Sequence, residues 1–159
     1  MRLPIVQVDA FASEAFTGNP AAVMPLVAWL DDAVLQAIAA ENNLSETAFT
    51  VPSEREDVDF DLRWFTPAAE VEMCGHATIA SGHILMTGSS VRFSTKSGIM
   101  TVTRRNDLLE LDMRAANLTE VHEPELCAAL GLPDTPVWLA TITKIPTGKF
   151  FRDRKEIPF

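Results

Sequence analysis

The sequence is short of cysteine, of basic residues and of long apolar runs, and each shortage excludes a class of protein. Its 159 residues include two cysteines, Cys74 and Cys127, which are too few for a disulfide scaffold. Lys and Arg together number 13, against 22 for Asp and Glu, so the net charge is −9. Such an acidic chain lacks the basic face that binds nucleic acid, and anionic membranes repel it. No apolar run approaches the roughly 18 residues of a membrane span. We therefore expect no nucleic-acid partner and no membrane partner.

What is present fits a globular protein of one domain, or of one domain and part of a second. Hydrophobic residues make up 47% of the chain and charged residues 22%, which are ordinary values for a folded protein. The first residues lack the long apolar core of a signal peptide and reach an acid at Asp9. We therefore expect a cytoplasmic protein.

Hydrophobic patterning predicts a series of strands with few helices between them. A helix is expected from the acidic caps Asp31 and Asp32 to the Asn42–Asn43 pair, and a short one between Pro124 and Gly131. The apolar residues of the first helix form one stripe: Val34, Leu35, Ile38 and Ala39. Strands are expected over 5–11, 21–26, 47–51, 59–64, 91–93, 99–103 and 108–113.

One segment, 75–85, has the composition of a buried helix. It reads Gly-His-Ala-Thr-Ile-Ala-Ser-Gly-His-Ile-Leu, with small or apolar residues in nearly every direction and no Lys, Arg, Asp or Glu. A helix without a charged face is usually buried on most sides, so the strands would have to wrap around it. The predicted fold class is therefore α+β: a curved, mixed, mostly antiparallel sheet wrapped around a central buried helix.

Glu46 is the first candidate for chemistry, because it lies between a helix end and an apolar strand. A carboxylate that is partly removed from water at such a position suits a general acid or base. A solvated glutamate in a loop would give the same pattern, so both interpretations stay open at this point.

The start of the chargeless helix is the second candidate. The N–H groups from Gly75 to Ala77 have no partner inside the helix, and the helix dipole there favours an anion such as a substrate carboxylate. Gly75 lets a ligand approach the backbone, and His76 and Thr78 can add hydrogen bonds. Cys74 lies beside the positive helix end, which favours its thiolate form. The alternative is a capped, buried helix whose cysteine and histidine only pack.

The spacing of the histidines and cysteines argues against a metal site. His76 and His83 lie two helical turns apart, about 10 Å at the rise of roughly 1.5 Å per residue, so one ion cannot reach both. His122 and Cys127 have no ligand-type spacing. Core or surface positions are expected for His83, His122 and Cys127.

Three motifs together resemble a known family. They are Asp9-Ala10-Phe11 followed by Phe16-Thr17-Gly18-Asn19-Pro20-Ala21-Ala22-Val23; Asn43-Leu44-Ser45-Glu46-Thr47-Ala48-Phe49; and Arg63-Trp64-Phe65-Thr66-Pro67 followed by Glu70 and Cys74-Gly75-His76-Ala77-Thr78. In this order and spacing they resemble the N-terminal half of the PhzF-like family, which is named for phenazine biosynthesis and has the diaminopimelate-epimerase-like fold. The resemblance covers about residues 1–135.

The resemblance implies two similar domains, with the active site in the cleft between them and the N-termini of both central helices facing it. It implies an isomerase or epimerase that moves a proton on a small carboxylate-bearing metabolite without a cofactor. Glu46 would be the general acid/base, with His76 as the second catalytic residue. Substrate-binding positions are implied at Asn19, Ser45, Cys74, Gly75, Ala77 and Thr78. Related epimerases keep a catalytic thiol at the position of Cys74.

The chain departs from this family in length, because members are nearly twice as long. We expect a PhzF-like N-terminal domain over 1–117, a linker and the start of a truncated second domain over 118–142, and an atypical basic tail over 143–159. Residues 144–159 carry a net charge of +3 and the rest of the chain −12. Such a change in composition suggests a flexible terminus, a cloning remnant or translation in the wrong frame.

Three hypotheses follow from these observations. The first is an isomerase in which Glu46 carries the proton, with half of the usual site absent. The second is a catalytically silent half-domain that keeps an anion-binding pocket. The third is a homodimer, in which two copies cover an exposed sheet edge and cleft face and bring their helix ends together.

Overall fold

The computed structural model describes residues 2–14, 17–114, 117–121, 124–129, 131, 137–141 and 147–149. The chain divides into two compact units, Met1–Asp112 and Met113–Phe159. All of the predicted site residues belong to the first unit. None of the helices in the described part of the chain is long and apolar enough to cross a membrane.

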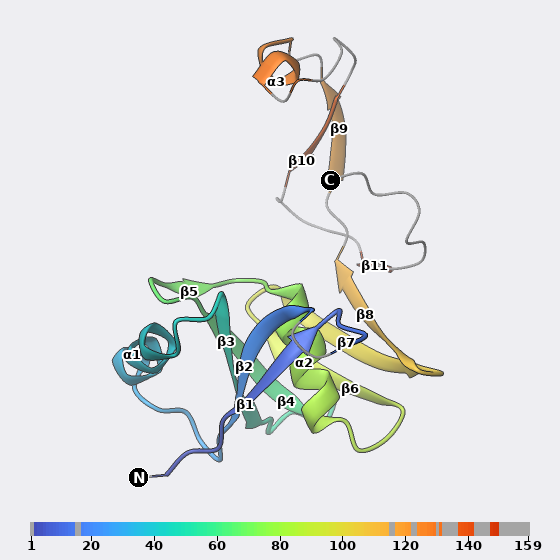
Figure 1. Ribbon diagram of the computed structural model, residues 1–159. Helices are drawn as coiled ribbons and strands as arrows, with labels where there is room; N and C mark the ends of the chain where they lie inside the picture. The colour runs from blue at the N-terminus through green and yellow to red at the C-terminus, as the bar shows by residue number, and fades with distance from the viewer. Residues whose placement is uncertain are drawn as a thin grey trace. The chain divides into compact units, whose positions relative to one another are not determined.

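The first unit is built on a mixed sheet that curves around a helix (Figure 1). The strands are β1 (Val6–Ala10), β2 (Asn19–Pro25), β3 (Glu46–Pro52), β4 (Phe60–Phe65), β5 (Glu70–Val71), β6 (Ser90–Thr95), β7 (Gly98–Arg105) and β8 (Leu108–Arg114). Their order is β1-β2-β3-β4-β6-β7-β8, and β5 pairs with β4. The β2–β3 and β4–β6 pairs are parallel, while the other neighbours are antiparallel. The predicted fold class is therefore confirmed.

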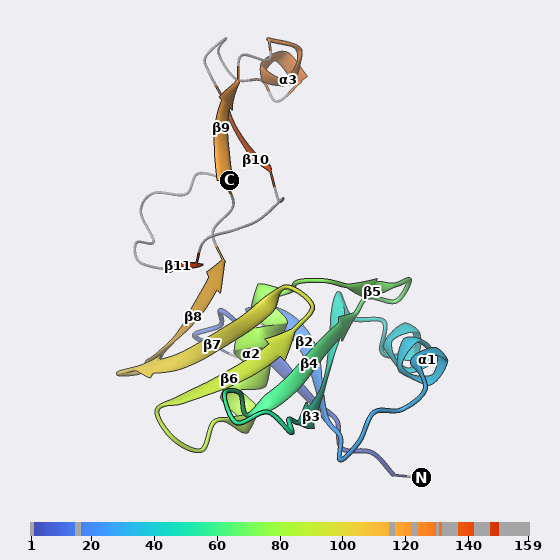
Figure 2. The same cartoon turned by 180° about the vertical axis from the view of Figure 1, so that it is seen from behind.

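The chargeless segment forms helix α2 (Gly75–Leu85) at the predicted limits, and the sheet encloses it. It contacts β1, β2, β3, β6 and β7, and the reverse view in Figure 2 shows β4, β6 and β7 crossing in front of it. The hydroxyls of Thr78 and Ser81 are buried, and each donates to the carbonyl four residues earlier. This local bonding lets polar side chains enter the core, and the Thr78 hydroxyl also lies 3.8 Å from Sδ of Met100 on β7.

Gly82 allows α2 to lie close to β7. A Cβ at this position would lie 2.6 Å from Cγ1 of Val102, a distance that real Cβ atoms do not show. Val102 is fully buried, so it has no open space to move into. Because glycine has no side chain, the helix that carries the candidate site can pack directly against β7.

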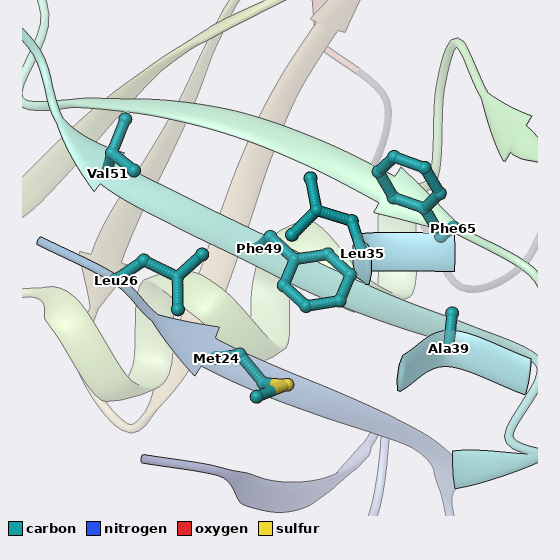
Figure 3. Packing of buried hydrophobic residues seen from close by; sticks show 7 residues of the cluster. All are labelled: Met24, Leu26, Leu35, Ala39, Phe49, Val51 and Phe65. Atoms are coloured by element: carbon teal, nitrogen blue, oxygen red, sulfur yellow. The ribbon is translucent and has the colours of Figure 1, made fainter. Parts of the chain in front are cut away.

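Helix α1 (Asp32–Asn42) covers the other face of the sheet. Figure 3 shows the hydrophobic cluster between them, in which Leu35 and Ala39 of α1 meet apolar residues from the strands and the connection after β2. The strand-side members are Met24, Leu26, Phe49, Val51 and Phe65. Because side chains alternate along a strand, the intervening residues of β3, such as Ala48, face α2. The central strands are thus buried on both faces.

The ends of α1 follow the predicted capping pattern. Asp31 is the N-cap, and its Oδ1 accepts a hydrogen bond of 2.9 Å from the N–H of Ala33. Asn43 ends the helix in the left-handed conformation, at φ 50°. Val34 was expected to belong to the buried apolar stripe of α1, but it is 43% exposed. The part of the helix that contacts the sheet is narrower than the predicted stripe.

The segment that leads into α2 is fixed by a charged cluster. Arg63 on β4 binds both carboxylate oxygens of Glu70 on β5, at 2.8 and 2.9 Å, and also Asp32 at 2.8 Å. Lys96 binds Glu70 from a third direction, at 2.5 Å. The Arg63 hydrogen bond, the largest cause, holds the pKa of Glu70 at about 2. The third sequence motif therefore includes a structural β4–β5 pairing as well as candidate catalytic residues.

The second unit contains β9 (Asn117–Val121), antiparallel to β10 (Val137–Thr141), with α3 (Pro124–Ala129) and β11 (Thr147–Lys149). Helix α3 begins at the predicted Pro124, and Gly131 beyond its end has φ +66°. Cys127 is buried and His83 is exposed, which agrees with the core or surface positions expected for them. His122 and most of the predicted tail at 143–159 lie outside the described residues.

Candidate active site

The side chain of His76 is the centre of the candidate site. Its Nε2 lies 3.3 Å from Oε2 of Glu46 and 3.4 Å from Oγ of Ser45. On the other edge of the ring, Nδ1 lies 3.4 Å from Sγ of Cys74. The structure therefore brings together four of the predicted site residues from two segments about thirty positions apart in the sequence.

The end of α1 and the start of β3 position Ser45 and Glu46. After the left-handed Asn43 the chain reverses and enters β3 beside β2, with Glu46 in register with Ala21. Asn42 supports this corner with a hydrogen bond of 3.1 Å from Nδ2 to Oγ1 of Thr47. The parallel β2–β3 pairing thus carries the carboxylate to the N-terminus of α2.

Glu46 is only partly accessible to water. Its side chain is 20% exposed, and its Oε2 is buried without a hydrogen-bond partner in the part of the chain that the structure describes. A buried carboxylate oxygen without a hydrogen bond is costly, so a ligand that satisfied this oxygen would be stabilised here. The interpretation of Glu46 as a fully solvated loop residue does not fit this position.

Burial keeps His76 neutral near pH 7. Burial is the largest cause that lowers the pKa of His76, while the charge of Glu46 and the backbone of Pro20 oppose it. Pro20 also accepts a hydrogen bond of 3.4 Å from the Ser45 hydroxyl. The part played by the Pro20 carbonyl was not recognised from the sequence, although this residue lies within the first family motif.

Cys74 differs from the sequence expectation. The helix end was expected to favour its thiolate, but burial raises the pKa of the Cys74 thiol to about 12, and Glu46 adds to this increase. The backbone amides of Ala77 and His76 act in the opposite direction and are outweighed. The expectation is therefore wrong for the folded chain near neutral pH, because the depth of the thiol exceeds the influence of the helix dipole.

The remaining predicted binding residues lie around this centre in different ways. Gly75 and Ala77 form the first turn of α2, and Ala77 is fully buried. Thr78 is also fully buried and donates its hydroxyl to the Cys74 carbonyl at 2.5 Å. Asn19 is exposed at the start of β2. The substrate-binding roles of these four residues stay predictions.

A surface hollow of about 370 Å³ lies beside the C-terminal end of α2. Its lining includes Phe60, Leu85 and Val91 and contains none of the predicted site residues. The chemistry-bearing groups are therefore gathered at the opposite end of the same helix.

Glu46, Cys74 and His76 also form a set of possible metal ligands. One ligand atom from each lies within 4.8 Å of the other two. Spacing along the sequence excludes an ion shared by His76 and His83, and it gives His122 and Cys127 no ligand-type pattern. It missed this set because Glu46 is distant from the others along the chain, and only the strand pairing brings it near.

This arrangement can carry out acid–base chemistry. A carboxylate lies against a neutral imidazole, and both lie next to the positive end of a helix that carries no acidic residue in its first turn. In the tautomer with its proton on Nε2, His76 turns its N–H group toward the Glu46 carboxylate, without the geometry of a hydrogen bond, and a nitrogen lone pair toward the Cys74 thiol. The site therefore combines a proton carrier with an electrostatic environment that suits an anion.

Comparisons with known proteins agree with the fold and the motifs. The family model PhzC-PhzF, described as "Phenazine biosynthesis-like protein", matches residues 8–131. An uncharacterised isomerase of Pseudomonas aeruginosa is 50% identical over 143 residues, which cover 86% of this chain and 54% of the relative. The chain thus spans about half the length of the curated relatives it matches.

Solved structures give the same result. The crystal structure of a phenazine biosynthesis protein of the PhzF family from Enterococcus faecalis matches with a TM-score of 0.76 and 43% identity. The match covers 88% of this chain and 55% of that one. A putative PhzC/PhzF phenazine biosynthesis protein from Clostridium difficile matches with a TM-score of 0.73 and 34% identity, over 87% of this chain and 55% of that one.

Proposed function

The chain belongs to the PhzC-PhzF family of phenazine biosynthesis-like proteins, and on that basis we propose that it provides the proton-transfer half of an isomerase or epimerase site. Its substrate is a small metabolite that carries a carboxylate. The observation that supports this most directly is Oε2 of Glu46, which is buried, lacks a hydrogen bond among the described residues and lies 3.3 Å from Nε2 of His76.

In the proposed reaction, Glu46 removes a proton from a carbon that is next to the substrate carboxylate or conjugated with it. The C–H bond breaks, its electron pair delocalises toward the carboxylate, and the proton moves to the oxygen of Glu46. Return of the proton to a different carbon shifts a double bond. Inversion of the same carbon instead requires a second acid on the opposite face, which delivers a proton there while Glu46 keeps the one it removed.

The other residues of the site orient Glu46 and stabilise the negative charge that develops on the substrate. His76 faces the Glu46 carboxylate and orients it, and Ser45 contacts the same ring nitrogen. The N-terminus of α2 supplies a positive potential for the substrate carboxylate. The N–H groups of His76 and Ala77 lie in the first turn of α2, directly after Cys74, so a carboxylate bound to them would lie beside that thiol.

Exchange of substrate hydrogen with D2O, followed by proton NMR, tests the proposal. The probes are α-amino acids and β,γ-unsaturated carboxylic acids, which have an acidic C–H bond. We expect the wild-type chain to exchange at least one probe, Glu46→Gln to lose that exchange, and Glu41→Gln, a change at an exposed position on α1, to keep it. Exchange that survives in Glu46→Gln would refute the role of Glu46.

A binding module without turnover is the second candidate, because the positive N-terminus of α2 could also hold an anion without any proton transfer. In this case the probes would bind, as measured by ligand-observed NMR, without exchange in any variant. That result would separate an anion pocket from an enzyme.

We also propose that two copies of the chain pair along an exposed edge of the sheet. The strand order places β1 at one edge of the sheet, and Ile5 and Val6 at that edge are 50% and 39% exposed. Exposed edges of this kind are costly in water and favour pairing. Sedimentation across micromolar concentrations should give a dimer, and a monomer throughout would exclude this arrangement.

A further inference from the structure

Three side chains with different donor atoms converge at the start of α2. Glu46 offers a carboxylate oxygen, Cys74 a sulfur and His76 an imidazole nitrogen, all within 4.8 Å of one another. Nitrogen, sulfur and carboxylate oxygen are the ligands that zinc takes in proteins, and three protein ligands leave a fourth position open to water or a ligand. We propose that Glu46, Cys74 and His76 bind one thiophilic divalent cation of the Zn²⁺ class.

The spacing of the donors is close to what such an ion requires. Zinc bonds of about 2.0–2.3 Å in a tetrahedron separate the ligand atoms by about 3.3–3.6 Å. Glu46 and His76 are 3.3 Å apart, and Cys74 and His76 are 3.4 Å apart. These contacts use opposite ring nitrogens, so binding requires a rotation of the imidazole that brings one nitrogen toward both partners. The three ligand atoms lie within 4.8 Å of one another, so the side chains must also move closer together around the ion.

The charges of the site also favour a cation. The buried Oε2 of Glu46 has no hydrogen-bond partner in the described chain, and a metal would satisfy it. Binding replaces the S–H bond of Cys74 by a sulfur–metal bond and releases that proton to solvent, while neutral His76 gives its nitrogen lone pair without releasing a proton. The carboxylate and the thiolate then balance the two positive charges of the ion.

This cation would act on the same groups as the proposed proton transfer. A metal on Glu46 would occupy the oxygen that accepts the substrate proton, so the ion is expected to inhibit that reaction. The binding itself does not depend on the proposed function. Direct titration therefore tests the metal site even if no probe exchanges its hydrogen.

Cobalt(II) reports on the thiolate ligand. The reduced full-length chain is titrated with Co²⁺, and the thiolate-to-cobalt charge-transfer band in the near ultraviolet is followed before displacement by Zn²⁺. We expect one equivalent to bind and Zn²⁺ to displace it. Cys74→Ser should abolish the band, and Glu46→Gln and His76→Gln should each weaken Zn²⁺ binding by roughly tenfold or more.

Cys127→Ser is the matched control, because Cys127 is the other buried cysteine of the chain. It should keep the band and the affinity for Zn²⁺. Thermal unfolding with and without Zn²⁺ gives a second readout, in which the wild-type melting temperature rises with the metal and that of Cys74→Ser does not. The proposal is overturned if the wild-type chain shows neither band nor Zn²⁺-dependent stabilisation, or if the band persists in Cys74→Ser.

Discussion

Substitution of Gly82 by alanine tests the close packing that fixes α2 in the sheet. In an isolated helix alanine would be favoured over glycine by about 1 kcal/mol. Here the new Cβ would lie 2.6–2.9 Å from three atoms of Val102. That side chain is fully buried and branched at Cβ, so the helix or the strand must move.

The expected effect of Gly82→Ala follows from these opposing contributions. Overpacking of a core costs about 1–3 kcal/mol, and three simultaneous clashes place this site in the upper part of the range. After the gain in helix propensity, we expect a net loss of about 1–2 kcal/mol in the free energy of unfolding. Urea titration followed by circular dichroism measures this difference.

A double-mutant cycle identifies the contact responsible. Val102→Ala alone should cost about 2–3 kcal/mol, because it leaves a cavity in a fully buried position. In the double variant the Cβ at position 82 fills part of that cavity, so the combined loss should fall short of the sum by about 1 kcal/mol or more. Gly88→Ala, which adds a Cβ in open space at an exposed position, is the control. An increase in stability for Gly82→Ala, or strict additivity, would show that contact with Val102 does not limit the packing of α2 against β7.

Three further changes test other parts of the structure. Because the Arg63 hydrogen bond lowers the pKa of Glu70 from 4.5 to about 2, its stabilising contribution is present above pH 4.5 and is lost as the pH falls toward 2. Glu70→Gln should therefore lower the free energy of unfolding by about 1–2 kcal/mol at pH 7, after allowance for solvent screening, and by less near pH 2. Urea titration at both pH values measures this, and equal losses would contradict the role of the ionised carboxylate. Asp31→Ala removes the N-cap of α1 and should cost about 1 kcal/mol in thermal unfolding, whereas an unchanged melting temperature would show that the cap is dispensable. Because burial raises the pKa of Cys74 to about 12, iodoacetamide at pH 8 should label it far more slowly in the folded chain than in urea, as read by mass spectrometry in a Cys127→Ser background.

The local elements could be predicted because their causes are local. The 75–85 helix has the predicted limits, since the absence of charge marks a segment that water does not reach. The caps at Asp31 and Asn43 depend on a few neighbouring residues. The mixed sheet could be predicted as a class, but its strand order depends on contacts between distant segments, and strand patterning carries little information about those.

The sequence predicted which residues belong to the candidate site, but it did not predict which of them contact one another. The family motifs identified Glu46 and His76, but their contact requires the parallel β2–β3 pairing and the turn at Asn43. The expectation of a thiolate at Cys74 was wrong. The sequence shows that Cys74 lies near a helix end, but it does not show how deeply the thiol is buried. The possible metal ligands were missed for the same reason, since two of them are close in sequence and the third is not.

The parallel contact between β4 and β6 is short, and this has a consequence for the order of folding. It consists of the pairs Phe60↔Phe93 and Asp61↔Ser94, whereas β6 and β7 pair over six positions. The β6–β7–β8 hairpins involve neighbouring segments and should form early, while the β4–β6 contact must close a loop that contains all of α2. We expect early intermediates to contain the hairpins while the imidazole on α2 is still separated from the carboxylate on β3, so that the contact between Glu46 and His76 is among the last features to assemble.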